Sequence, residues 1–210
     1  EALHALDVER FNHDFAMLLS GERVDLPIFD FTTGRRAKEG KQLTLSEGQP
    51  IIIEGIHGLN PELSHSIPEQ MKFRIYLSTL TQLNLDRHNR IPTTDARIIR
   101  RMVRDSQFRG YPADETLDIW PSVRRGEETW IFPYYEEADA IFNSHLIYEL
   151  AALKPFAEPL LLGISRDHPY YMDADRLLKL LSYFRSIDTE DIPANSILRE
   201  FIGGSIFAKK

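Results

Sequence analysis

A group of regularly spaced arginines is the part of this sequence best suited to chemistry. Arg97, Arg101 and Arg104 lie four and three residues apart, a spacing that places them on one face of a helix, and Arg109 follows closely. Guanidinium groups keep their charge and bind phosphate oxygens through paired hydrogen bonds, so this face predicts a surface that binds phosphate. The alternative is a solvated helix face whose arginines pair with nearby acids such as Asp105.

A glutamate that ends an apolar run is the second candidate. Ile51 to Ile53 predict a strand buried on both faces, and the run ends at Glu54 followed by Gly55. Ligands in open α/β sheets gather at the carboxyl ends of strands, so Glu54 is well placed for chemistry. The alternative is an ordinary buried strand that ends in a solvated glutamate. His57 follows shortly after, as a candidate substrate contact or a residue that caps a turn.

Alternating helices and strands must position these residues. Hydrophobic periodicity predicts helices over residues 7–19, 94–108, 127–137, 145–156 and 173–184. Short apolar runs predict strands over residues 26–31, 42–45, 51–54, 72–77, 138–143 and 160–164. This alternation predicts an α/β layered fold. We expect one main domain over residues 1–157, with residues 158–210 as a C-terminal extension packed on it.

Four segments of the chain match a known family in order and spacing. They are Leu26–Phe31 with Thr33–Arg36, then Ile51–Pro61, then Asp86–Arg90 continuing through Arg100–Asp105 to Arg109–Gly110, and finally Ile192–Gly204. On these residues the chain resembles the uridine kinase and phosphoribulokinase family of P-loop kinases. The resemblance implies a P-loop NTPase-like three-layer parallel sheet with helices on both faces, and a C-terminal helical extension.

The same resemblance implies ATP-dependent phosphoryl transfer to a nucleoside hydroxyl, with ATP and Mg²⁺ as cofactors. Glu54 and Arg101 are the implied catalytic residues. Glu54 would hold Mg²⁺ through water, and Arg101 would lie near the acceptor substrate and the transferred phosphate. Arg104 and Arg109 would bind the phosphates of ATP. Residues 86–110 would form a mobile lid over the nucleotide.

A short aromatic segment is implied to bind the acceptor. The resemblance places Phe29, Asp30 and Phe31 over the nucleoside, where an aromatic ring can stack on a base. The alternative is that both phenylalanines belong to the core. His57 and Arg101 complete the expected substrate contacts. Gly34 stands where pyrimidine-specific relatives carry a histidine that reads the base, which leaves the acceptor undefined.

The chain departs from the family pattern in one respect. The sequence contains no G-x-x-x-x-G-K-[ST] string, the loop whose amides and lysine hold phosphates in this family, and the family's general-base Asp has no counterpart. We therefore expect a fold that lacks the P-loop strand, a chain inactive by itself, and catalysis by a longer parent protein. A regulatory module that binds nucleotide or RNA without turnover remains an alternative, as does a kinase for another small alcohol.

Composition limits the expected partners and location. The formal net charge is −7, which argues against bulk binding to nucleic acid or to anionic membranes. There is no cysteine, which fits a cytoplasmic protein, and no apolar run approaches the length of a membrane span. We expect a small nucleoside as partner, and a chain that aggregates, pairs with a second copy through an open strand edge, or rearranges.

Overall fold

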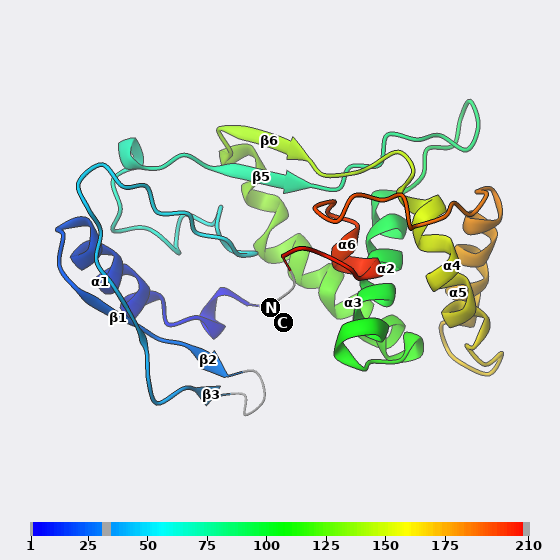
Figure 1. Cartoon of the computed structure of the whole chain (residues 1–210), viewed down its shortest axis with the longest axis horizontal. Helices are drawn as coiled ribbons and strands as arrows, with labels where there is room; N and C mark the ends of the chain where they lie inside the picture. The colour runs from blue at the N-terminus through cyan, green and yellow to red at the C-terminus, as the bar shows by residue number, and fades with distance from the viewer. Residues whose placement is uncertain (1, 31–34, 208–210) are drawn as a thin grey trace. The chain divides into compact units, whose positions relative to one another are not determined.

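The chain forms an α/β structure in the computed structural model, which describes residues 2–30 and 35–207 (Figure 1). The α-helices are α1 (Val8–Leu19), α2 (Thr93–Arg104), α3 (Ala113–Trp130), α4 (Glu149–Leu162), α5 (Tyr171–Ser182) and α6 (Arg199–Ile202). Short helical turns are η1 (Leu3–Ala5), η2 (Glu69–Met71), the π-helical η3 (Asp105–Arg109) and η4 (Phe132–Glu137). The strands are β1 (Val24–Leu26), β2 (Phe29–Asp30), β3 (Arg35–Arg36), β4 (Lys41–Leu43), β5 (Ile75–Ser78) and β6 (Ala140–Asn143). Over the described ranges, no helix combines the length and apolar character that crossing a membrane requires.

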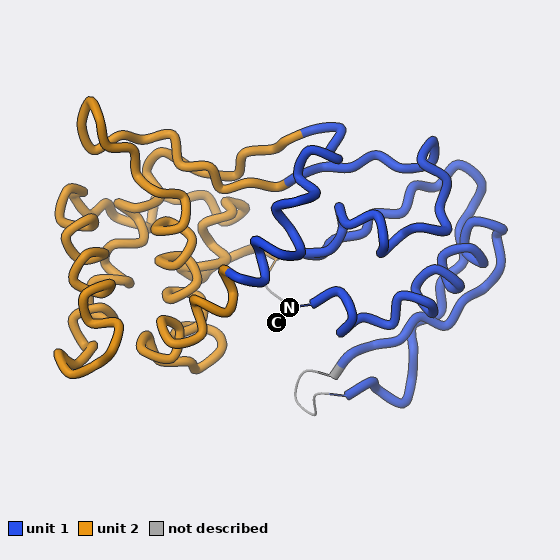
Figure 2. Tube along the Cα trace, turned by 180° about the vertical axis from the view of Figure 1, so that it is seen from behind, with its two compact units in different colours: residues 1–76, 125–140 blue, residues 77–124, 141–210 orange. Residues whose placement is uncertain are grey.

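The chain divides into two compact units (Figure 2). Unit 1 holds residues 1–76 and 125–140, and unit 2 holds residues 77–124 and 141–210. The domain division predicted at residue 157 falls inside α4 and remains a prediction.

Unit 1 is organised around α1 and an antiparallel strand pair. The carboxylate of Asp7 caps α1, accepting a hydrogen bond from the Arg10 amide at 3.1 Å. Asn12 is buried, and its amide nitrogen donates to the carbonyl oxygens of Val8 at 2.8 Å and Leu63 at 3.0 Å. The strands predicted over residues 26–31 and 42–45 form with shifted bounds, and β1 pairs with β4 in antiparallel register.

The predicted parallel strands are present as β5 and β6, which lie side by side in Figure 1. The Ala140 amide donates to the Arg74 carbonyl at 3.1 Å, and the Ser144 amide donates to the Ser78 carbonyl at 2.7 Å. Partners therefore advance together along both strands, which is the parallel pattern.

A hydrophobic core lies in unit 2, where α2, α4, α5 and α6 pack together (Figure 1). Its fully buried members include Ile99, Met102, Leu150, Leu153 and Leu177. The helix predicted over residues 173–184 is confirmed as α5, whose buried residues Leu177, Leu180 and Leu181 lie on the side that packs against α4.

The prediction of a strand over Ile51–Glu54 is wrong. No strand forms there, and the side chain of Ile52 is 91% exposed. A strand buried on both faces needs hydrogen-bonding neighbours, and the described strands form only three separate two-stranded sheets. Among the described residues, β5 and β6 alone represent the parallel part of the predicted three-layer sheet.

Two other predicted elements change in the structure. The predicted strand over residues 160–164 is wrong, because α4 continues through Pro155 and Pro159 to Leu162. An apolar run of this length is compatible with either element, and here Leu161 joins the helical core. The helix predicted from residue 127 begins earlier, because α3 runs from Ala113 through Pro121 and ends at Trp130.

Candidate functional site

Helix α2 presents a core face and an arginine face, as its spacing predicts. Ile98, Ile99 and Met102 are buried, while Arg101 and Arg104 lie partly exposed on another side. The helix therefore belongs to the core of unit 2. If it moves as the predicted lid, the helices packed on it must move with it.

The three arginines predicted to act on phosphate converge on one buried carboxylate. Asp105 begins the π-helical turn η3 and is 1% exposed. Arg101 Nε donates to Asp105 Oδ2 at 3.1 Å, and Arg109 Nη1 donates to Asp105 Oδ1 at 3.1 Å. Arg104 Nε lies 4.0 Å from Asp105 Oδ1. Asp105 thus holds two guanidinium groups directly and lies close to a third.

The arginine cluster, defined as Arg101, Arg104 and Arg109, keeps an excess of positive charge. Its other acidic partner among the described residues is Glu200, whose Oε1 accepts a hydrogen bond from Arg104 Nη1 at 2.9 Å. Three guanidinium charges face two carboxylates, which leaves one formal positive charge at a partly exposed surface. Such an arrangement suits a polyanion, because further acceptors can share the guanidinium donors.

Arg100 does not join this cluster. Its guanidinium makes a two-pronged ion pair with the carboxylate of Glu149 at the start of α4, and both side chains are buried. Arg100 Nη2 also donates to the Ser144 carbonyl at 3.3 Å, and the guanidinium lies 5.2 Å from the ring centroid of Phe201. Arg100 is therefore a structural link from α2 to α4 and α6.

His145 lies against the same buried pair, with Nδ1 3.4 Å from Glu149 Oε2 and its side chain 3% exposed. Burial lowers the pKa of the imidazole below its ordinary value of 6.5; the Glu149 carboxylate opposes part of this shift, and the Arg100 charge adds to it. The folded chain therefore favours the neutral form of the His145 imidazole.

We expect acidification to destabilise unit 2 through His145. Its folded pKa lies below its unfolded pKa, so its contribution is complete above pH 6.5 and is lost as the pH falls through the folded value. Urea unfolding at pH 7.5 and pH 5.5 checks this: His145→Asn should lose less stability on acidification than the wild type does. His13→Asn, which changes an exposed histidine, should keep the wild-type difference. Equal pH dependence in His145→Asn and the wild type would contradict the assignment.

Glu54 and His57 lie together in unit 1, around a cavity of about 420 Å³. Glu54 is exposed, whereas His57 is 5% exposed. The rest of the lining is mainly apolar and includes Leu6, Phe11 and Leu63. The cavity joins one acid and one imidazole to an apolar wall, an arrangement typical of small-molecule sites. The structure therefore brings Glu54 and His57 together, and brings the three arginines together in the other unit.

The predicted aromatic wall is described only in part. Phe29 pairs with Arg36 in the β2–β3 register and is 52% exposed, so it does not belong to the core. Asp30 pairs with Arg35 through the backbone. Phe31 and Gly34 lie outside the described residues.

A metal site built by protein groups alone is absent from the described part of the chain. No group of three or more His, Cys, Asp or Glu side chains there could hold an ion. Mg²⁺ typically keeps several waters and binds one or two carboxylates plus substrate phosphates, so a single acid such as Glu54 is compatible with it.

The sequence indicates one of the acids that organise these arginines, because Asp105 is the acid named in the alternative in which the arginine face pairs with its neighbours. Asp105 is four residues from both Arg101 and Arg109, so helical spacing contains the signal for its position. Glu149 and Glu200 lie 49 and 96 residues from their arginine partners, and no local pattern links such distant positions.

The profile of the Phosphoribulokinase / Uridine kinase family matches residues 2–149, so the chain belongs to this family, as the sequence predicts. A uridine kinase of Staphylococcus epidermidis is 28% identical over 138 residues, covering 65% of this chain and 58% of that protein. A uridine kinase of Chlamydia pneumoniae is 28% identical over 173 residues, covering 80% of this chain and 70% of that protein. A uridine kinase of Bacillus pumilus is 28% identical over 155 residues, covering 71% and 65%. The chain thus spans between 58% and 70% of the length of these three relatives.

Proposed function

We propose that this chain forms part of an ATP-dependent kinase that phosphorylates a nucleoside hydroxyl, as its uridine kinase relatives suggest. The observation that carries the proposal is the arginine cluster, whose excess positive charge is held in place by the buried Asp105 in a chain of this family. Phosphoryl transfer depends on such placed charge more than on covalent chemistry.

Within this proposal each residue has a defined task. Arg101 is fixed by Asp105 and directs its guanidinium toward the phosphate being transferred, near the acceptor. Arg104 and Arg109 bind the phosphates of ATP. Glu54 would hold Mg²⁺ through water, and the bound ion would neutralise charge developing on the phosphate oxygens.

The acceptor contacts and the complete sheet belong to the same proposal. Phe29, Asp30 and Phe31 form the nucleoside wall, and His57 contacts substrate from the cavity that it shares with Glu54. Within the proposal, the two-stranded β5–β6 sheet would form part of a larger P-loop NTPase-like sheet whose P-loop strand this chain does not supply. Nucleoside binding by Phe29 is supported by its exposure, because a core phenylalanine would not reach a ligand.

We expect Arg104→Ala to weaken Mg-ATP binding about 10- to 100-fold, because a hydrogen bond to a charged group contributes about 1.5–3 kcal/mol. Isothermal titration calorimetry on the 210-residue chain measures this directly. The control is Arg185→Ala, which removes an exposed arginine with no ion pair among the described side chains. Equal affinities in the two variants would contradict the assignment of Arg104 to phosphate.

A second candidate function is nucleotide binding without turnover. It is favoured by one sequence observation, the absence of a G-x-x-x-x-G-K-[ST] string. A thermal-shift titration with Mg-ATP and with uridine, combined with an assay for ADP, separates the candidates. ATP stabilisation with uridine-dependent ADP release supports the kinase, whereas stabilisation without ADP supports the binding module.

A further inference from the structure

The C-terminal segment brings an acid to the arginine cluster. Glu200 lies on α6, and its Oε1 is 2.9 Å from Arg104 Nη1, although the two residues are 96 positions apart. Both side chains keep contact with solvent, at 53% exposure for Glu200 and 28% for Arg104. Arg104 Nε makes no hydrogen bond within the described chain, so Glu200 is the main partner of this guanidinium there.

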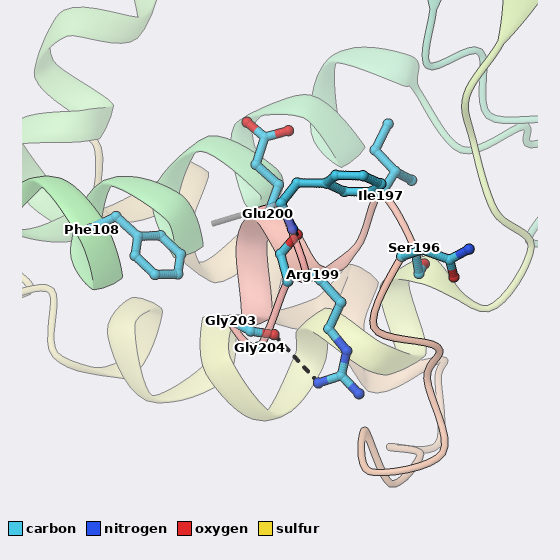
Figure 3. Close-up of a pocket in the computed structure, with 10 residues that line it drawn as sticks. Phe108, Ser196, Ile197, Arg199, Glu200, Gly203 and Gly204 are labelled. Carbon is cyan, nitrogen blue, oxygen red and sulfur yellow. Dashed lines mark hydrogen bonds between the residues drawn. The ribbon is translucent and has the colours of Figure 1, made fainter. Parts of the chain in front are cut away.

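The backbone around Glu200 is firmly anchored. Leu198 and Phe201 are buried in the core of unit 2 on either side of it. The Arg199 guanidinium donates to the carbonyl oxygens of Thr189 at 2.9 Å and of Gly203 at 3.4 Å, and the second of these bonds is drawn in Figure 3. The hydrogen bonds hold α6 within the C-terminal segment, and the packing of α6 against α2 keeps the Glu200 carboxylate within reach of Arg104.

Open space lies beside this contact. A cavity of about 570 Å³ is lined by Phe108, Ile197 and Glu200 together with neighbouring residues of the C-terminal segment (Figure 3). The segment turns at Gly203 and Gly204, whose φ angles of 87° and 76° favour glycine. The exposed carboxylate therefore has room to leave Arg104 without disturbing the buried residues that flank it.

We propose that Glu200 is an internal competitor of the nucleotide phosphate, occupying Arg104 until a polyphosphate displaces it. A carboxylate and a phosphate offer the same kind of oxygen acceptors to a guanidinium, so both bind Arg104 in the same way. Arg101 and Arg109 are already fixed by Asp105, which leaves Arg104 as the member of the cluster whose partner exchanges. This inference rests on the proposed function, because it requires Arg104 to bind phosphate.

Mg-ATP titrations of the 210-residue chain test the competition. Glu200→Gln should bind ATP about two- to fivefold more tightly than the wild type, a factor consistent with the strength of an exposed ion pair. Glu190→Gln removes an exposed acid from the same segment, one without an ion pair among the described residues, and should stay at wild-type affinity. In an Arg104→Ala background, Glu200→Gln should no longer tighten binding.

Each other outcome is decisive. If Arg104→Ala weakens binding but Glu200→Gln does not tighten it beyond Glu190→Gln, the competition is overturned and the proposed function stands. If Arg104→Ala leaves the affinity unchanged, the phosphate role of Arg104 fails and the competition fails with it. Weaker binding of Mg-ATP by Glu200→Gln would show that Glu200 positions Arg104 for ATP, which overturns the competition. If neither the wild type nor Glu200→Gln binds Mg-ATP, the competition is also overturned.

Discussion

Replacing Glu149 with glutamine is expected to lower the free energy of unfolding by about 3–5 kcal/mol, the usual cost of breaking a buried ion pair from one side. The substitution keeps the shape of the side chain but leaves the Arg100 guanidinium buried without a charge partner. Urea or guanidinium unfolding of both proteins at pH 7.5 measures the difference. Glu158→Gln on the same helix is the matched control, because Glu158 is only partly buried and forms no ion pair in the described part of the chain.

A double variant separates the lost charge from damage to packing. Arg100→Met combined with Glu149→Leu removes both charges, and we expect it to recover most of the lost stability, since apolar pairs often replace buried ion pairs without cost. A loss below about 1 kcal/mol for Glu149→Gln would contradict the structural role assigned to this pair.

Replacing Asp105 with asparagine is expected to cost about 2–3 kcal/mol, less than a fully buried pair because its arginine partners keep some contact with water. The variant leaves the like charges of Arg101, Arg104 and Arg109 near one another without the carboxylate between them. Chemical unfolding measures the cost, with circular dichroism to confirm that the helices remain.

Asp175→Asn supplies the control for Asp105, since it changes an exposed acid on α5 that has no ion pair among the described residues. The two variants remove the same charge from the same protein. If both lower stability equally, Asp105 is not the organising group of the arginine cluster.

Local periodicity accounts for what could be predicted about the site. The 3.6-residue repeat is sufficient to place Arg101 and Arg104 on one face of a helix and Ile99 on another, and α2 has this arrangement. It also contains Asp105 as a neighbour of Arg101. The partner of Arg100 depends instead on how α4 packs against α2, which is a tertiary property and has no local signal.

The failure at Ile51–Ile53 has a different physical reason. Apolar β-branched residues favour an extended backbone, but a strand exists only where another strand supplies hydrogen bonds. In the described chain no strand pairs with this segment, and Ile52 is almost fully exposed. Similar apolar runs do form the strands β5 and β6, because each strand supplies the backbone hydrogen bonds that the other needs.

Because α2 carries a buried face and an arginine face, it tolerates no insertion or deletion within its length. An insertion of one residue near Ile98 would turn everything beyond it by about 100°, the rotation of one helical residue. The buried side chain of Val103 would move to the partly exposed position that Arg104 now holds, and Arg101 would move to the buried position of Met102. Substitutions at its exposed positions change one side chain at a time, whereas insertions and deletions would disrupt the core and the arginine cluster together. Homologous sequences that keep both features should therefore align across this helix without gaps.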